Sequence, residues 1–152
     1  MKKFELTAEC VTNIFGKKLF RIKALVAFGN VEEGELGGFV EKESNLANDG
    51  DAWVYGDAWV YGDAQVCGDA WVCGDLDYAI VGGFGSEQRT TTFFRQKDGT
   101  VGVRCGCFYG TLEEFREKVK KTHKDSNYAQ EYLMIADLME LHFAGGKEDD
   151  ER

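Results

Sequence analysis

Two groups of residues in this 152-residue chain have the types and spacing that chemistry requires. The first consists of Cys105 and Cys107, which would lie on the same face of a strand, and His123, sixteen residues further on. Thiolates and imidazoles bind zinc, but a zinc site needs a fourth ligand and usually a wider spacing between its paired cysteines. Inert, buried cysteines explain the pair better. We therefore expect no metal and no cofactor.

The second group is a glycine-rich bend that is followed by an arginine and several hydroxyls, within residues 82–92. Successive backbone N–H groups in such a bend can hold an anion, and the Arg89 guanidinium could clasp two phosphate oxygens. The predicted ligand-binding residues are Gly85, Ser86, Arg89, Thr90, Thr91 and Thr92. The alternative is a hinge whose threonines serve strand formation, because a glycine-rich loop alone is weak evidence for a site.

The elements that would position these groups begin with a repeat. Four consecutive hexapeptides of the form Asp-Ala-x-Val-x-Gly occupy residues 51–74. Alanine and valine, two residues apart, would point inward on a strand, and glycine tolerates the backbone angles of the corner. Three hexapeptides would close one triangular coil. We therefore predict a short left-handed parallel β-helix with a buried row of valines: Val54, Val60, Val66 and Val72.

The same coil predicts which residues face outward. Residues 18 apart would stack at about 4.8 Å, the spacing of neighbouring strands. Trp53 would then lie over Trp71, and Asp51 over Asp69. Exposed aromatic side chains are typical anchors of protein interfaces. The predicted partner-binding residues are Trp53, Trp71, Trp59, Tyr55, Tyr61, Asp51 and Asp69.

Such a short repeat cannot cover its own ends, because stacked repeats need neighbours or caps on both sides. We expect an N-terminal β cap in residues 1–45, the repeat in residues 46–78, an α+β segment in residues 79–146 and a disordered acidic tail in residues 147–152. The predicted fold class is therefore mainly β with an α+β C-terminal part.

Local signals define that α+β segment. Asp98-Gly99 between two β-rich runs predicts a hairpin. Thr111 and Glu114 have the spacing of a capping box and predict a first helix. A second helix should begin near Asp125 or Ser126 and end at residues 144–146.

Composition and charge limit the partners. The net charge is −9, and residues 51–85 contain six Asp and no Lys or Arg, so we expect no nucleic-acid partner. The acidic corners could equally serve solubility alone. No apolar run approaches the ~18 residues of a membrane span, and the first residues lack the pattern of a signal peptide. Five cysteines without framework spacing suit reduced thiols. We expect a cytoplasmic protein with no membrane partner.

Three stretches together, residues 36–46, the Tyr-Gly-Asp-Ala-Trp-Val repeats and residues 105–115, resemble small hexapeptide-repeat proteins of bacteriophages and bacterial mobile elements, often described as polymer-forming. The resemblance carries no agreed chemistry. It implies a phage origin, action in the cytoplasm of the bacterial host, and a role in binding and neutralising a host component.

The better-known hexapeptide enzymes differ from this chain. The acyltransferases use a histidine on the β-helix as general base, and the β-helix carbonic anhydrases bind zinc through three histidines. Here the only histidines are His123 and His142, both outside the repeat, so neither chemistry fits. We expect a non-enzymatic binding protein that forms a dimer or trimer. Its target would be a host protein or a small phosphorylated ligand, such as a signalling nucleotide of a bacterial defence system. A self-assembling structural protein is the alternative, and an acyltransferase is less favoured.

Overall fold

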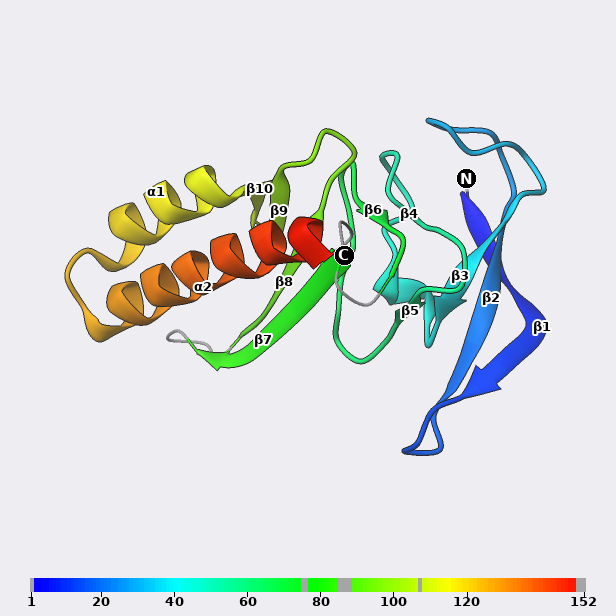
Figure 1. Ribbon diagram of the computed structural model, residues 1–152, viewed down its shortest axis with the longest axis horizontal. Coiled ribbons are helices and arrows are strands. Elements are labelled where there is room, and N and C mark those ends of the chain that lie inside the picture. The colour runs from blue at the N-terminus through cyan, green and yellow to red at the C-terminus, as the bar shows by residue number, and fades with distance from the viewer. Residues whose placement is uncertain (1, 75–76, 85–88, 107, 150–152) are drawn as a thin grey trace.

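The computed structural model describes residues 2–74, 77–84, 89–106 and 108–149, with the backbone alone for Arg89 and residues 145–149. Three parts follow one another along the long axis of the molecule: an N-terminal sheet, the hexapeptide repeat, and a C-terminal sheet with two helices (Figure 1). Among the residues described, no helix is both long enough and apolar enough to cross a bilayer.

The N-terminal sheet is a hairpin extended by two further strands. β1 (Phe4–Thr12) and β2 (Lys18–Ala24) are antiparallel, and β3 (Leu36–Val40) pairs antiparallel with β2. Leu19, Ile22 and Ala24 of β2 are buried, and Ile22 and Ala24 belong to the same apolar core. β3 then pairs in parallel with β5 (Trp59–Val60) of the repeat, which joins the sheet to the next part of the chain.

The repeat contributes three strands of two residues each: β4 (Trp53–Val54), β5 and β6 (Trp71–Val72). β4 and β6 pair in parallel, with Trp53 opposite Trp71, so the predicted 18-residue register is confirmed for these two strands. The predicted burial of the valine row is confirmed as well, since all four valines are wholly inaccessible to solvent.

The predicted left-handed β-helix is nevertheless wrong. The strands belong to separate sheets: a mixed sheet in the order β1-β2-β3-β5, the two-stranded parallel sheet β4-β6, and an antiparallel sheet β10-β9-β8-β7. The hexapeptides fill little more than one coil, so parallel stacking has no third layer in which to continue. The 3-10 turn η1 (Glu43–Asn45) lies between β3 and β4. Phe39 pairs with Trp59 and Leu46 with Val66, each 20 residues apart, whereas Trp53 and Trp71 are 18 apart, so the spacing of a regular coil is not kept.

The C-terminal sheet is a meander of β7 (Tyr78–Phe84), β8 (Arg89–Arg95), β9 (Val101–Cys105) and β10 (Phe108–Thr111). The predicted hairpin is present as β8 and β9. The predicted capping box is confirmed, since the Glu114 N–H donates to Thr111 Oγ1 and the Thr111 N–H to Glu114 Oε1 at the start of α1 (Leu112–His123). α2 (Asn127–Asp149) runs beside α1 (Figure 1).

The predicted end of the second helix at residues 144–146 is wrong, because α2 continues to Asp149. Of the predicted tail, residues 147–149 are helical and residues 150–152 lie outside the described part of the chain.

Two apolar cores are built on opposite faces of the C-terminal sheet. The first lies inside the repeat and under the N-terminal sheet and includes Phe94. The second lies between the sheet and the two helices and includes Phe93. Successive side chains of a strand point to opposite faces, so these neighbours on β8 each fill a different core, and both are wholly buried.

Candidate functional site

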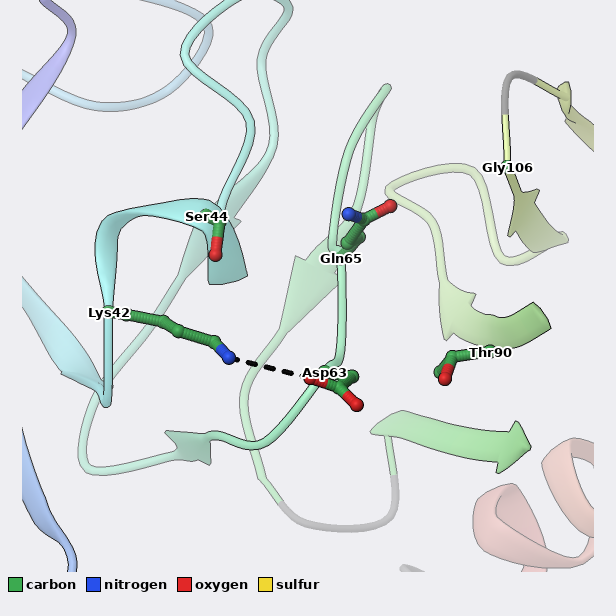
Figure 2. A pocket seen from close by; sticks show the side chains of 6 residues that line it. All are labelled: Lys42, Ser44, Asp63, Gln65, Thr90 and Gly106. Carbon is green, nitrogen blue, oxygen red and sulfur yellow. Dashed lines mark hydrogen bonds and ion pairs between the residues drawn. The ribbon is translucent and has the colours of Figure 1, made fainter. Parts of the chain in front are cut away.

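A polar groove lies where the three parts of the molecule meet. It consists of two adjoining hollows of about 370 and 400 Å³ that share Ser44 and Gln65. The first hollow is lined by Lys42, Ser44, Asp63, Gln65, Thr90 and Gly106 (Figure 2). The second extends past Glu43 and Asp49 to Cys67 and Arg104. We call the two hollows together the polar groove.

One wall of the polar groove is held in place by a buried amide. Asn45 of η1 is wholly buried, and its Oδ1 accepts hydrogen bonds from the backbone N–H groups of Glu41 (3.2 Å) and Lys42 (3.0 Å). Its Nδ2 donates to the carbonyls of Gly62 and Ala64, each at 3.0 Å. Asn45 therefore ties the η1 corner to the repeat, and this sets Lys42 and Ser44 opposite the loop that carries Asp63 and Gln65.

The opposite wall is β8, which the Thr92 hydroxyl links to the repeat. The Gln65 N–H donates to Thr92 Oγ1 at 2.9 Å, and Thr91 Oγ1 donates to Cys105 Sγ at 3.2 Å. Thr91 and Thr92 are both buried, so neither hydroxyl faces a ligand. Of the three threonines, Thr90 lines the polar groove (Figure 2).

The predicted anion loop is described only in part. Gly85 and Ser86 lie outside the described residues, and Arg89 is described by its backbone in β8. Thr91 and Thr92 serve internal contacts. Of the described threonines of this loop, Thr90 lines the first hollow, and the other residues that line this hollow come from other segments of the chain.

Among the described lining residues, each hollow has one basic side chain. Lys42 Nζ lies 3.4 Å from Asp63 Oδ1, and both side chains are substantially exposed, so this ion pair is weak and exchangeable. Arg104 Nε donates to the Gly106 carbonyl at 2.8 Å. Its guanidinium also contacts the Cys67 thiol, whose pKa is raised above the usual range by burial, although Arg104 acts in the opposite direction.

Uncommitted polar groups also line the polar groove. Within the described part of the chain, no side-chain hydrogen bond engages the Ser44 hydroxyl, the Gln65 amide or the Thr90 hydroxyl. Figure 2 shows Lys42 and Ser44 on one side of the first hollow, Thr90 on the other, and Asp63 between them. The polar groove thus offers a cation, a carboxylate and free donors and acceptors to a small polar molecule.

The aromatic interface that the sequence predicts is only partly present. Trp53 is wholly buried, with Phe28 and Phe4 packed edge-on against it at 5.3 and 6.4 Å between ring centroids. The expectation of an exposed Trp53 face is wrong, because the N-terminal segment folds over this side of the coil. Trp71 remains half-buried and packs against Tyr55 at 5.2 Å.

The other predicted partner-binding residues are scattered. Trp59 is half-buried and Tyr61 is exposed. Asp51 lies near Lys3, and its negative charge acts to raise the Lys3 pKa. The Asp69 carbonyl accepts a hydrogen bond from the Lys97 N–H at 3.0 Å. Of these residues, Asp51 is near Tyr55, because its negative charge helps to raise the Tyr55 pKa.

The two described members of the cysteine–histidine group, Cys105 and His123, make separate contacts. Cys105 accepts the Thr91 hydroxyl, Cys107 lies outside the described residues, and His123 packs against the rings of Tyr128 and Tyr132 at 5.7 and 5.9 Å.

Sequence reasoning missed Lys42, Ser44, Asp63, Gln65 and Arg104. They lie in no common motif and up to some sixty residues apart along the chain. The one usable signal was the coil itself, because stacking of the repeat on the preceding segment brings Leu46 next to Val66. No protein family model matches this chain, and no curated protein matches it either.

Proposed function

We propose that this protein is a non-enzymatic binding protein that holds a small phosphorylated molecule in the polar groove. The observation that carries the proposal is that two adjoining hollows, one lined by Lys42 and the other by Arg104, share the uncommitted groups of Ser44 and Gln65, with Thr90 in the first hollow as well. Hollows of several hundred Å³ with a few convergent polar groups are the usual form of small-molecule sites.

The charges of the polar groove favour a particular kind of ligand. A phosphate could take the place of Asp63 beside the Lys42 ammonium, and charge-assisted hydrogen bonds of this type are strong. Asp63, Asp49 and Glu43 also line the groove and repel a bare anion. The ligand should therefore carry hydroxyl, amine or ring N–H groups that these carboxylates can accept from, in addition to its phosphate. Nucleotides and sugar phosphates have this combination, and inorganic phosphate does not.

Binding without turnover is supported by the chemistry of the groove. A nucleophile needs a neighbouring base or a lowered pKa. The Cys67 thiol has a raised pKa, and a protonated thiol is a poor nucleophile. A protein that binds its ligand and does not convert it depletes the free ligand. In the bacteriophage setting that the sequence resemblance implies, such sequestration of a host signalling molecule would act against a defence system.

Titration calorimetry against a panel of cyclic and linear nucleotides, sugar phosphates and inorganic phosphate tests the proposal. We expect at least one organic phosphate to bind. Lys42→Ala or Arg104→Ala should then weaken its affinity about ten- to a hundredfold, since a hydrogen bond to a charged group is worth ~1.5–3 kcal/mol. The matched control is Lys121→Ala, which removes an exposed lysine of α1 and should leave affinity unchanged. Failure of every panel member to bind the parent protein would overturn the proposal.

A protein partner is the second candidate, and one observation favours it. Tyr55 and Trp71 form a partly exposed aromatic pair, and the negative charges of Glu35 and Asp51 help burial to raise the Tyr55 pKa, which places these carboxylates beside the pair. Such a surface fits a basic protein. Trp71→Ala should then abolish the protein complex and leave binding in the polar groove intact, and Lys42→Ala should have the opposite pattern.

A further inference from the structure

The most exposed large apolar side chains of the described residues lie together at the tip of the β1–β2 hairpin. Ile14 is 93% exposed and Phe15 is 79% exposed. The hairpin is the outermost part of the N-terminal sheet, and its turn projects away from the rest of the molecule (Figure 1). Exposure of two adjacent apolar side chains to water is energetically unfavourable, which suggests that another molecule covers them.

The tip is a fixed structure. Asn13 Oδ1 accepts hydrogen bonds from the N–H groups of Phe15 (2.9 Å) and Lys17 (3.0 Å), and the Asn13 N–H donates to the Lys17 carbonyl at 2.9 Å. Gly16 has a positive φ of 82°, which closes the turn and which residues with side chains rarely adopt. The turn therefore presents Ile14 and Phe15 outward in a defined geometry.

The charge around the tip is opposite to that of the whole protein. Residues 10–31 contain Lys17, Lys18, Arg21 and Lys23 and no Asp or Glu, in a chain with a net charge of −9. Lys17 and Lys18 are exposed and directly follow the apolar pair. Arg21 binds the carboxylates of Glu9 and Asp57 at 2.8 and 3.0 Å.

Distance keeps the acidic repeat from cancelling this local charge. A strand advances about 3.3 Å per residue, so the Cα atoms of Lys18 and Arg21 lie about 10 Å apart along β2, and the tip lies further out. Exposed charges are largely screened beyond about 8 Å at physiological ionic strength. At that salt concentration, a surface in contact with the tip experiences mainly the two lysines.

We propose that the tip of the β1–β2 hairpin is an anchor for an anionic lipid bilayer. Ile14 and Phe15 enter the boundary between headgroups and acyl chains, and Lys17 and Lys18 bind lipid phosphates at the rim, as basic side chains with long apolar stems do at membrane interfaces. The expectation of no membrane partner rested on the lack of a spanning segment, which an anchor of this depth does not need. A second copy of the chain fits less well, since contact between two tips would bring four lysines together.

Co-sedimentation of the full-length protein with vesicles tests this proposal, using equal parts phosphatidylglycerol and phosphatidylcholine in one set and phosphatidylcholine alone in the other. We expect binding to the anionic vesicles, and at least tenfold weaker partitioning for the double variant Ile14→Ser/Phe15→Ser. A lysine near an anionic surface is worth about fivefold in partitioning, so Lys17→Gln and Lys18→Gln should each reduce binding by about that factor.

The matched control is Met134→Ser/Leu141→Ser, which removes two exposed apolar side chains from α2 and should bind as the parent does. Thermal unfolding should be the same for all variants, because the altered side chains are exposed. A fluorescence blue shift of Phe15→Trp on addition of anionic vesicles would support insertion. A parent protein that stays in the supernatant, a tip variant that binds like the parent, or self-association without lipid that depends on Ile14 and Phe15 would each overturn the proposal.

Discussion

Gly68 of the repeat lies directly beneath the side chain of Tyr109 on β10, and a methyl group on Gly68 would overlap the tyrosine hydroxyl. The ring of Tyr109 stacks on Phe94 with an interplanar angle of 6°, and its hydroxyl donates to Gln96 Oε1. The corner of one hexapeptide and the edge strand of the C-terminal sheet are thus in close contact, so glycine is required there for space as well as for its positive φ of 62°.

Gly68→Ala should therefore lower the unfolding free energy more than a glycine-to-alanine change at an equivalent corner of the repeat. Gly56 has nearly the same φ, 60°, and open space around it. We expect Gly56→Ala to lower the unfolding free energy by about 1–2 kcal/mol, the cost of the left-handed conformation, and Gly68→Ala to lower it by roughly 3 kcal/mol or more. In the double variant Gly68→Ala/Tyr109→Ala, most of the additional loss caused by the overlap with Tyr109 should disappear. Equal losses in the two alanine variants, measured by chemical denaturation, would contradict close packing at this joint.

Asn45 provides a second test, since it links η1 to the repeat. Asn45→Ala removes a buried group with four hydrogen bonds. The Lys42 N–H and the carbonyls of Gly62 and Ala64 lose this partner, whereas the Glu41 N–H keeps its hydrogen bond to the Val60 carbonyl. Each unsatisfied buried group costs ~1–3 kcal/mol, so we expect the unfolding free energy to fall by about 3 kcal/mol or more. Ser44→Ala, at the exposed neighbouring position, should change it by less than about 0.5 kcal/mol. Similar effects of the two changes would argue against the buried amide as a structural link.

Lys3 makes the stability of the fold depend on pH. Its ammonium is buried and donates to the carbonyls of Ala52 (2.7 Å) and Gly50 (3.3 Å). Burial lowers its pKa from 10.5 to about 8, although the negative charges of Asp51 and Asp49 raise it. Between about pH 8 and pH 10.5 the folded protein therefore binds fewer protons than the unfolded chain, and the unfolding free energy contributed by Lys3 rises with pH in that window.

The difference in unfolding free energy between the parent and Lys3→Met should consequently change in favour of the parent from pH 8 to pH 10.5. Methionine keeps an apolar stem and does not titrate. The tyrosines and cysteines that titrate in the same range are present in both proteins, so their effects cancel in the difference. Urea denaturation at several pH values measures it, and a difference that stays constant with pH would show that the Lys3 pKa is unchanged by folding.

Asp77 connects the end of the repeat to the C-terminal part. Its Oδ1 accepts from Arg95 Nε at 2.9 Å and its Oδ2 from the Cys73 N–H at 2.8 Å, while Arg95 also donates to the Phe143 carbonyl on α2. Both charged side chains are largely buried. Removal of one partner from such a pair leaves a poorly solvated charge, so Asp77→Ala should lower the unfolding free energy by about 2–4 kcal/mol. Asp125→Ala, at an exposed position, serves as the control, and equal stability of both variants would contradict this role.

Much of the local structure could be predicted because its causes lie close together in sequence. The alternation of alanine and valine is sufficient to bury Val54 and Val72, and Thr111 with Glu114 forms the capping box that its spacing indicates. The register of Trp53 against Trp71 follows from the length of three hexapeptides.

The wrong predictions concern contacts between distant segments. The burial of Trp53 depends on Phe4 and Phe28, which no repeat pattern can place above it. The assignment of a β-helix assumed that the coil would propagate, whereas an antiparallel hairpin and a meander limit it on either side. The polar groove escaped prediction for the same reason, since Lys42, Asp63 and Thr90 become neighbours only after the three parts have assembled.

Because Phe93 and Phe94 point to opposite faces of β8, this strand contributes to both apolar cores of the protein. If β8 unfolds, both cores lose a buried phenylalanine, so the two cores should unfold in one cooperative step. The amide hydrogens of β8 should then be among the last to exchange with deuterium. For the same reason, the part of the protein on either face of β8 should not be replaceable by an unrelated domain. The replacement would have to pack against the phenylalanine that β8 presents on that face.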